Sequence, residues 1–182
     1  CIDTIILGEA ESSLVELVRR TVDGKDPQDV PGVAYRSHGL VKHNQIPKPN
    51  EDLDSLDFTY LPALDNWKHF LRISQSGYLK DMRPRFWLSI ARGCAYDCVH
   101  CGGGRNAYRL LTGRENIAFR SPKRVAEDIE QLSLLGVREI SLGHDPEIAT
   151  ENYQTRMLDE IKKRKLEICI YYESFRVPSR SF

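Results

Sequence analysis

The sequence lacks several features that would place it in common functional classes. Its 182 residues include no uncharged apolar run close to the ~20 residues that a membrane-spanning helix needs. The 26 basic and 26 acidic residues cancel, so no excess positive charge points to nucleic acid or an anionic membrane. The first residues show neither an initiator Met nor the charged and apolar regions of a signal peptide. We therefore expect an excerpt of a longer cytoplasmic protein, with no nucleic-acid or membrane partner.

The cysteines are unevenly placed. Of five cysteines, Cys1 and Cys169 are isolated, whereas Cys94, Cys98 and Cys101 form a Cys-x3-Cys-x2-Cys pattern. An odd number with this clustering suits a metal site in a reducing compartment better than a disulfide framework. Cys169 lies in the apolar run "LEICIYY", where we expect a buried thiol that packs as a small hydrophobe.

The first third of the chain predicts a small α+β segment. A β-branched run at residues 2–8 predicts a strand, and helical spacing of apolar residues follows at 9–22. Two short strands on either side of "SHG" predict a hairpin at 33–46. The Pro- and Asp-rich stretch 47–66 has no sustained periodicity and indicates a linker. We place a domain boundary after residue 66.

Residues 67–182 show a different pattern, in which strands and helices alternate. The expected strands and helices, in chain order, cover residues 86–91, 121–136, 137–143, 150–165 and 166–175. Ser121 and Gly136 are the expected caps of the first helix, and Thr150 caps the second. Short connections between these elements predict a parallel βαβαβ unit with right-handed crossovers. In such α/β folds the chemistry gathers at the carboxyl ends of the strands, where the cysteine loop follows the first strand.

The three clustered thiolates are soft ligands that suit zinc or an iron–sulfur cluster. A structural zinc site needs a fourth protein ligand. His100 is adjacent to Cys101, but neighbouring residues rarely reach one small ion together. A cubane cluster is larger, so three sulfurs can hold three irons and leave the fourth open. We favour a [4Fe–4S] cluster with an open position. An electron-transfer iron–sulfur protein and a zinc-binding interaction module remain the alternatives.

The cysteine loop and its position after a strand resemble the radical S-adenosylmethionine (radical SAM) enzymes. In that family the same spacing follows the first strand of a partial (β/α)6 TIM-like barrel and binds a [4Fe–4S] cluster. The open iron binds S-adenosylmethionine, and reduction cleaves this cosubstrate to a 5′-deoxyadenosyl radical that abstracts hydrogen from a substrate. The resemblance implies that residues 67–182 are the first part of such a barrel and that Cys94, Cys98 and Cys101 are the cluster ligands.

The same resemblance implies an iron–sulfur oxidoreductase of unspecified reaction. Its partners would be a small-molecule or peptide substrate and an electron donor such as flavodoxin or ferredoxin. His100 stands where the family often has an aromatic residue that touches the adenine. Gly143 and Asp145, in "GHDP", stand where the family has a Gly-Gly-Glu motif that binds the methionine ammonium group. Glu173, at the end of the third strand, is a further cosubstrate-binding candidate. The alternative interpretation of Asp145 is an acidic turn residue before Pro146.

The N-terminal stretch "CIDTIILGEAESSLVEL" resembles the run that joins a Rossmann-like cobalamin-binding domain to a radical SAM barrel. Gly8, Glu9 and Glu11 match the Gly-Glu-x-Glu motif of that subfamily. The resemblance implies that residues 1–66 are the tail of such a domain with a hairpin and a linker. It also implies cobalamin-dependent methyl transfer as one reaction open to the protein. The Asp-x-His-x-x-Gly cobalamin motif is not in the sequence, so cobalamin is expected only in the full-length protein.

Overall fold

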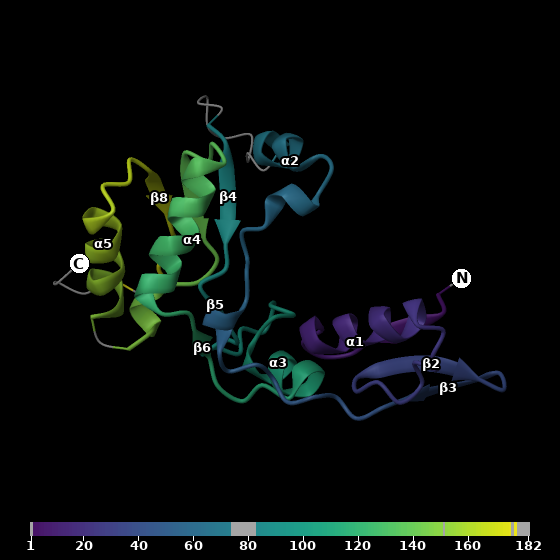
Figure 1. The fold of residues 1–182 in the computed structure, drawn as a ribbon. Helices are drawn as coiled ribbons and strands as arrows, with labels where there is room; N and C mark the ends of the chain where they lie inside the picture. Colours follow the sequence, from purple (N-terminus) through teal and green to yellow (C-terminus); the bar gives the residue numbers. More distant parts are fainter. Residues whose placement is uncertain (1, 74–82, 151, 176, 178–182) are drawn as a thin grey trace. The chain divides into compact units, whose positions relative to one another are not determined.

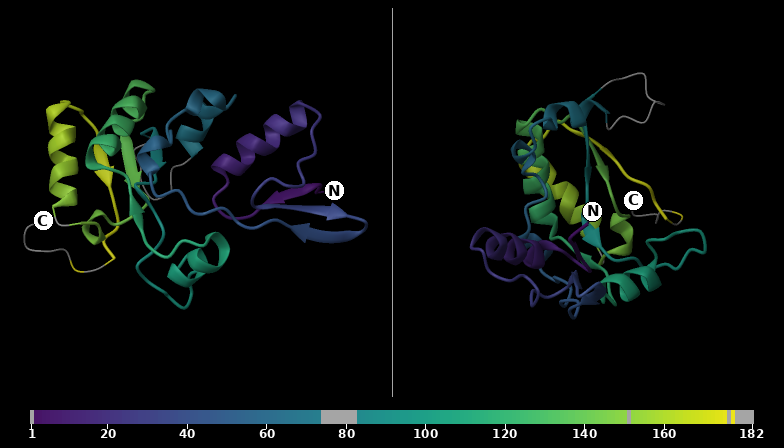
Figure 2. Two further views of the ribbon diagram at one scale, coloured as in Figure 1. Left: turned by 60° about the horizontal axis from the view of Figure 1, so that its bottom comes forward. Right: turned by 90° about the vertical axis from the view of Figure 1, so that its right-hand side faces the viewer.

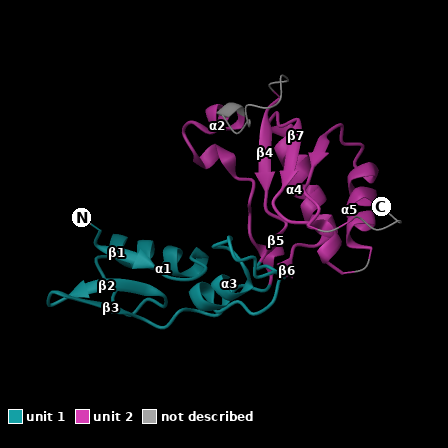
Figure 3. Cartoon of the chain, turned by 180° about the vertical axis from the view of Figure 1, so that it is seen from behind, with its two compact units in different colours: residues 1–51, 93–117 teal, residues 52–92, 118–182 magenta. Residues whose placement is uncertain are grey.

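The computed structural model describes residues 2–73, 83–150, 152–175 and 177. Figure 1 shows the elements in chain order. Contacts divide the chain into two compact units, which Figure 3 colours separately. Unit 1 comprises Cys1–Glu51 and Gly93–Ile117, and unit 2 comprises Asp52–Arg92 and Ala118–Phe182. The chain passes between the two units after residues 51, 92 and 117. The assignment of residues 1–66 and 67–182 to two parent domains stays a prediction.

Unit 1 contains an antiparallel sheet in the order β1-β2-β3 and two helices. The elements are β1 (Thr4–Ile6), α1 (Glu11–Val22), β2 (Val33–Ser37), β3 (Leu40–His43) and α3 (Arg105–Thr112). The strand, helix and hairpin predicted in the first 46 residues are therefore confirmed. Helix α3 has no counterpart among the predicted elements. It follows the cysteine loop and ends at Gly113, whose φ of 74° is a left-handed conformation that favours glycine.

Unit 2 contains a parallel sheet in the order β4-β7-β8 with two crossover helices. The elements are β4 (Arg85–Leu88), α4 (Pro122–Leu134), β7 (Glu139–Leu142), α5 (Tyr153–Lys163) and β8 (Cys169–Tyr171). The predicted βαβαβ unit is confirmed. Helices α4 and α5 contact each other and cover the same face of the sheet (Figure 2). The three strands follow one another in chain order across the sheet. That they belong to a partial barrel stays a prediction.

The remaining elements are short. They are η1 (Leu53–Ser55), η2 (Leu61–Ala63), α2 (Trp67–Ile73), β5 (Ala91–Arg92), β6 (Ala118–Phe119) and η3 (Pro146–Ile148). None of the helices that the structure describes has the length and apolar character of a bilayer-spanning segment.

The core of unit 2 lies between the sheet and its two helices. Leu88, Ile129 and Ile140 are completely buried there. Each buried aliphatic side chain of this size contributes about 1.5–3 kcal/mol to folding. Phe86, Ile140 and Ile170 occupy matching positions on neighbouring strands and share the face under the helices. Residues that alternate with them therefore point to the other face of the sheet.

Three local predictions are corrected by the structure. The strand predicted at 86–91 is divided, because β4 ends at Leu88 and β5 pairs antiparallel with β6. Helix α5 begins after Asn152, whose φ is 61°, and not after Thr150. Cys169 is exposed and not buried. It pairs with Glu139 on the sheet face opposite to the helices, so the alternation of the strand turns it away from the core.

The part of the predicted linker that lies in unit 2, from Asp52 on, is irregular apart from η1 and η2 and is attached to buried side chains of that unit. The buried Arg120 guanidinium donates to the carbonyl oxygens of Leu53, at 2.6 Å, and Leu56, at 3.1 Å. It also forms an ion pair with Asp128 at 2.6 Å and lies 4.3 Å from the centre of the Phe58 ring. Burial raises the pKa of Asp128, although the positive charge of Arg120 acts in the opposite direction. Arg120 is therefore one of the groups that hold this segment, together with the backbone N–H of Ser121, which donates to Asp54 Oδ1 at 2.8 Å.

Candidate functional site

The cysteine loop belongs to unit 1 and follows β5 in the chain. All three of its thiols are free. Cys94 is partly exposed, and Cys98 and Cys101 are exposed. The Cys94 sulfur accepts a hydrogen bond from the backbone N–H of Tyr96 at 3.4 Å, and the Cys101 sulfur accepts one from Gly103 at 3.4 Å. Hydrogen bonds to sulfur stabilise the negative charge of a thiolate.

Whether this loop can bind a metal ion or cluster depends on the ligand atoms that it offers. In the part of the chain that the structure describes, no three His, Cys, Asp or Glu side chains are gathered closely enough to hold a metal ion. The loop nevertheless supplies three accessible thiols and backbone N–H groups directed at two of them. Such a soft donor set suits zinc or an iron–sulfur cluster. The residues therefore fit the expected group by their chemistry.

The second half of the loop is held against its first half by hydrogen bonds. The backbone N–H of Asn106 donates to Asp97 Oδ1 at 2.7 Å, beside the start of α3. A Cβ atom at Gly104 would lie 3.1 Å from both Asp97 Oδ1 and the Tyr96 oxygen. A side chain at position 104 would therefore be crowded, whereas a Cβ at Gly102 would meet nothing within 4 Å. The sequence motif alone does not distinguish these glycines, and Asp97 escaped the sequence analysis because a single acid in a polar loop carries no signal.

Asp145 lies in unit 2 at the turn after β7 and is completely buried. Its Oδ1 accepts a hydrogen bond from the backbone N–H of Glu147 at 2.9 Å, which caps η3. Its Oδ2 accepts one from the backbone N–H of Phe175 at 2.9 Å, and Ser174 Oγ lies 3.5 Å away. The carboxylate thus connects the end of β7 to the residues that follow β8. This geometry is that of a turn residue, and a contact with a cosubstrate stays a prediction.

Two other predicted residues lie near the carboxyl ends of strands in unit 2. The backbone N–H of Gly143 donates to the Leu88 carbonyl at 2.9 Å, which continues the pairing of β7 with β4. Glu173 is exposed, and its Oε1 accepts a hydrogen bond from the Tyr171 hydroxyl at 3.3 Å. His100 is exposed in the cysteine loop of unit 1. The predicted residues therefore form two sets, one in each unit.

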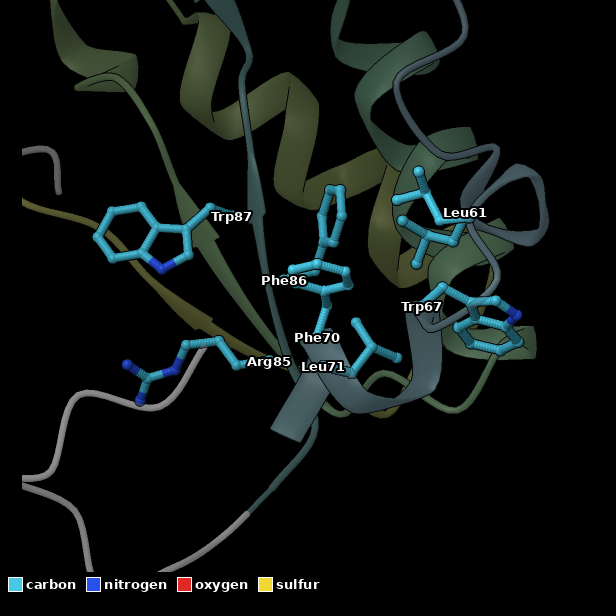
Figure 4. Close-up of a pocket in the computed structure, with 8 residues that line it drawn as sticks. Leu61, Trp67, Phe70, Leu71, Arg85, Phe86 and Trp87 are labelled. Carbon is cyan, nitrogen blue, oxygen red and sulfur yellow. The ribbon is translucent and has the colours of Figure 1, made fainter. Parts of the chain in front are cut away.

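A separate apolar pocket of about 280 Å³ lies between α2 and β4 in unit 2 (Figure 4). Its lining consists of Leu61, Leu64, Trp67, Phe70, Leu71, Arg85, Phe86 and Trp87. Figure 4 shows Phe86 directed toward α2, whereas Arg85 and Trp87 extend from the other side of the strand. Arg85 forms a buried ion pair with Glu139. Among the described residues that line it there is no thiol, imidazole or carboxylate, so these residues offer apolar contact and not the chemistry of the cysteine loop.

No protein-family model matches the chain. In sequence it is 27% identical over 172 residues to a protein of Pyrococcus horikoshii named as an uncharacterized methyltransferase. The match covers 92% of this chain and 34% of that protein. The chain therefore spans about a third of the length of this relative.

The solved structures that share the fold include the following two. The radical S-adenosylmethionine methyltransferase TsrM from Kitasatospora setae has a TM-score of 0.62 at 18% identity, over 90% of this chain and 30% of that one. The cobalamin-dependent S-adenosylmethionine radical enzyme OxsB has a TM-score of 0.58 at 18% identity, over 92% of this chain and 22% of that one. At this identity the likeness establishes a common fold for the matched region.

Proposed function

We propose that this chain is the cluster-binding part of a radical SAM enzyme and that the intact protein reductively cleaves S-adenosylmethionine. The observation that carries the proposal is the group of free thiols at Cys94, Cys98 and Cys101, in one loop after the first strand region of a parallel βαβαβ unit. The fold shared with TsrM and OxsB, whose names state radical S-adenosylmethionine chemistry, supports it.

In this proposal the three thiolates hold a [4Fe–4S] cluster with one open iron. Once held by these residues and reduced, such a cluster would supply the electron for reductive cleavage of a carbon–sulfur bond of the sulfonium. The backbone N–H groups of Tyr96 and Gly103 stabilise the charge on two of the ligand sulfurs. The barrel, completed by residues outside this chain, excludes water from the radical.

The cosubstrate contacts are proposed for four residues. His100 contacts the adenine, and Gly143, Asp145 and Glu173 line the methionine end. Asp145 already accepts two backbone hydrogen bonds, but a carboxylate has about four lone-pair sites, so it retains capacity for an ammonium group. Its burial makes any such contact strong, because little water competes.

Methyl transfer is the reaction class that the comparisons favour. The Pyrococcus horikoshii relative and TsrM are both named as methyltransferases, and OxsB is named as cobalamin-dependent. We assign no residue of this chain to cobalamin. The proposal also includes two partners. One is a substrate, which is a small molecule or a peptide, and the other is an electron donor such as flavodoxin or ferredoxin.

Electron paramagnetic resonance of the intact protein, reconstituted with iron and sulfide without oxygen, tests the open iron. After reduction with dithionite, addition of S-adenosylmethionine is expected to change the spectrum, because amino and carboxylate groups then bind the fourth iron. A reduced cluster whose spectrum is unchanged by S-adenosylmethionine would favour an electron carrier. A protein that takes up zinc and no iron–sulfur cluster would favour the interaction module.

A further inference from the structure

We propose that Glu9 and Arg114 form a positioning pair that keeps the two ends of the cysteine-bearing segment, residues 93–117, together. The proposal rests on the proposed function, since it concerns how the cluster-binding loop is held. It gives a structural role to Glu9 of the Gly-Glu-x-Glu motif, to which the proposed function assigns no role.

The Arg114 side chain is buried and fully engaged within unit 1. Its Nε lies 2.7 Å from Glu9 Oε1 and its Nη2 lies 3.1 Å from Glu9 Oε2, which makes a bidentate ion pair. Its Nη1 lies 3.2 Å from Glu51 Oε1, and its Nη2 donates to the Asn50 carbonyl at 2.6 Å. The side chain of Arg114 is 0% exposed and that of Glu9 is 9% exposed, whereas that of Glu51 is 68% exposed. Glu9 is therefore the principal partner.

Arg114 also packs against the residue that precedes the first cysteine. A Cβ atom on Gly93 would lie 3.2 Å from Arg114 Cδ and 3.0 Å from the Asn116 oxygen. Gly93 has a φ of 100°, so both space and backbone conformation require glycine. The entry and exit of the segment therefore touch at a point one residue before Cys94. The side chain at this point is that of Arg114, which is ion-paired with Glu9.

Loss of the Glu9 charge would leave a buried guanidinium with only one, mostly exposed, carboxylate. Burial acts against the charged form of Arg114, but its hydrogen bonds to Glu9 and the charges of Glu9 and Glu51 raise its pKa overall. Removing one partner of such a buried pair is strongly destabilising, because an uncompensated charge remains. Local opening at Gly93 would then let Cys94, the next residue, move away from the other two cysteines. We therefore expect loss of the Glu9 charge to weaken cluster binding more than it lowers the stability of the whole protein.

The test compares Glu9→Gln with Asp128→Asn in the intact protein. Asp128→Asn removes the carboxylate of a buried arginine pair in unit 2, Arg120–Asp128. The two measurements are the rate at which a chelator removes iron from the reconstituted protein and the rate at which iodoacetamide alkylates Cys94, the partly exposed thiol next to Gly93, without a cluster. For Glu9→Gln both rates are expected to rise roughly tenfold, since opening of the loop ends becomes easier. For Asp128→Asn they should stay near wild type despite lower thermal stability.

Equal rates for Glu9→Gln and the wild type would overturn the proposal, as would an equal increase for Asp128→Asn. If Glu9→Gln does not fold, Glu51→Gln takes its place, and a smaller increase in both rates is expected because that side chain is 68% exposed. If the wild-type protein takes up no cluster, the proposed function fails. The alkylation rates of the cluster-free protein still decide whether Glu9 holds the segment closed.

Discussion

Replacement of Cys98 by alanine is expected to remove the iron–sulfur cluster and all S-adenosylmethionine cleavage. Two thiolates in an exposed loop would be left to hold a cluster that needs three protein anchors. Iron content after anaerobic reconstitution should fall from about four irons per chain to a small fraction of that value. Iron and sulfide analysis with visible absorbance measures the loss directly.

Cys169→Ala is the matched control for this variant. Cys169 is also an exposed free thiol, but it lies on β8 in unit 2, outside the loop. Its removal should leave iron content and cleavage at wild-type levels. If Cys98→Ala retained a full cluster, or if Cys169→Ala lost it equally, the three loop cysteines would not be the ligand set.

Asp145→Ala is expected to lower both stability and cosubstrate affinity. The buried carboxylate accepts backbone hydrogen bonds from Glu147 and Phe175, and their loss leaves two donors unsatisfied. Unfolding in denaturant should show a loss of about 2–4 kcal/mol. Affinity for S-adenosylmethionine, measured by calorimetry on the reconstituted protein, should fall about tenfold or more if the carboxylate also binds the ammonium group.

Asp145→Asn separates these two effects. The amide oxygen still accepts one backbone hydrogen bond, so the stability loss should be smaller than for alanine, whereas the negative charge is gone. Affinity for S-adenosylmethionine should still fall about tenfold, because the bond to the ammonium group loses its charge assistance. Wild-type affinity in Asp145→Asn, with an intact cluster, would leave Asp145 as a turn residue only.

Local signals explain why much of the fold could be predicted from the sequence. Ser121 accepts a hydrogen bond from the Arg124 N–H at 3.1 Å, as its position before Pro122 predicts for a helix cap. Gly136 has a φ of 93° just after α4, as expected for a left-handed helix end. Apolar runs marked the three parallel strands because these are short, buried on at least one face and bounded by turn residues.

Features that depend on distant partners could not be predicted. The division of the strand at 86–91 depends on the pairing of β5 with β6, which a window of neighbouring residues does not contain. The exposure of Cys169 depends on which face of the sheet the helices cover. Helical spacing predicted α1, yet Val22 is 81% exposed, because periodicity does not identify what packs on a helix.

The candidate site could also be predicted only where its signals are local. The spacing of the cysteines is a local pattern and could be recognised directly. The burial of Asp145 and its bond to the Phe175 N–H join residues 30 positions apart, and no sequence pattern signals such a contact. Arg114 and Glu9 are 105 positions apart, so their ion pair was equally hidden.

Formation of 5′-deoxyadenosine tests the central claim most directly. The intact protein, reconstituted anaerobically, is incubated with S-adenosylmethionine and dithionite, and the products are separated by liquid chromatography and identified by mass. We expect 5′-deoxyadenosine and methionine to accumulate only when both cluster and reductant are present. A wild-type protein that carries a complete [4Fe–4S] cluster yet releases no 5′-deoxyadenosine with any reductant would contradict the account and favour an electron carrier.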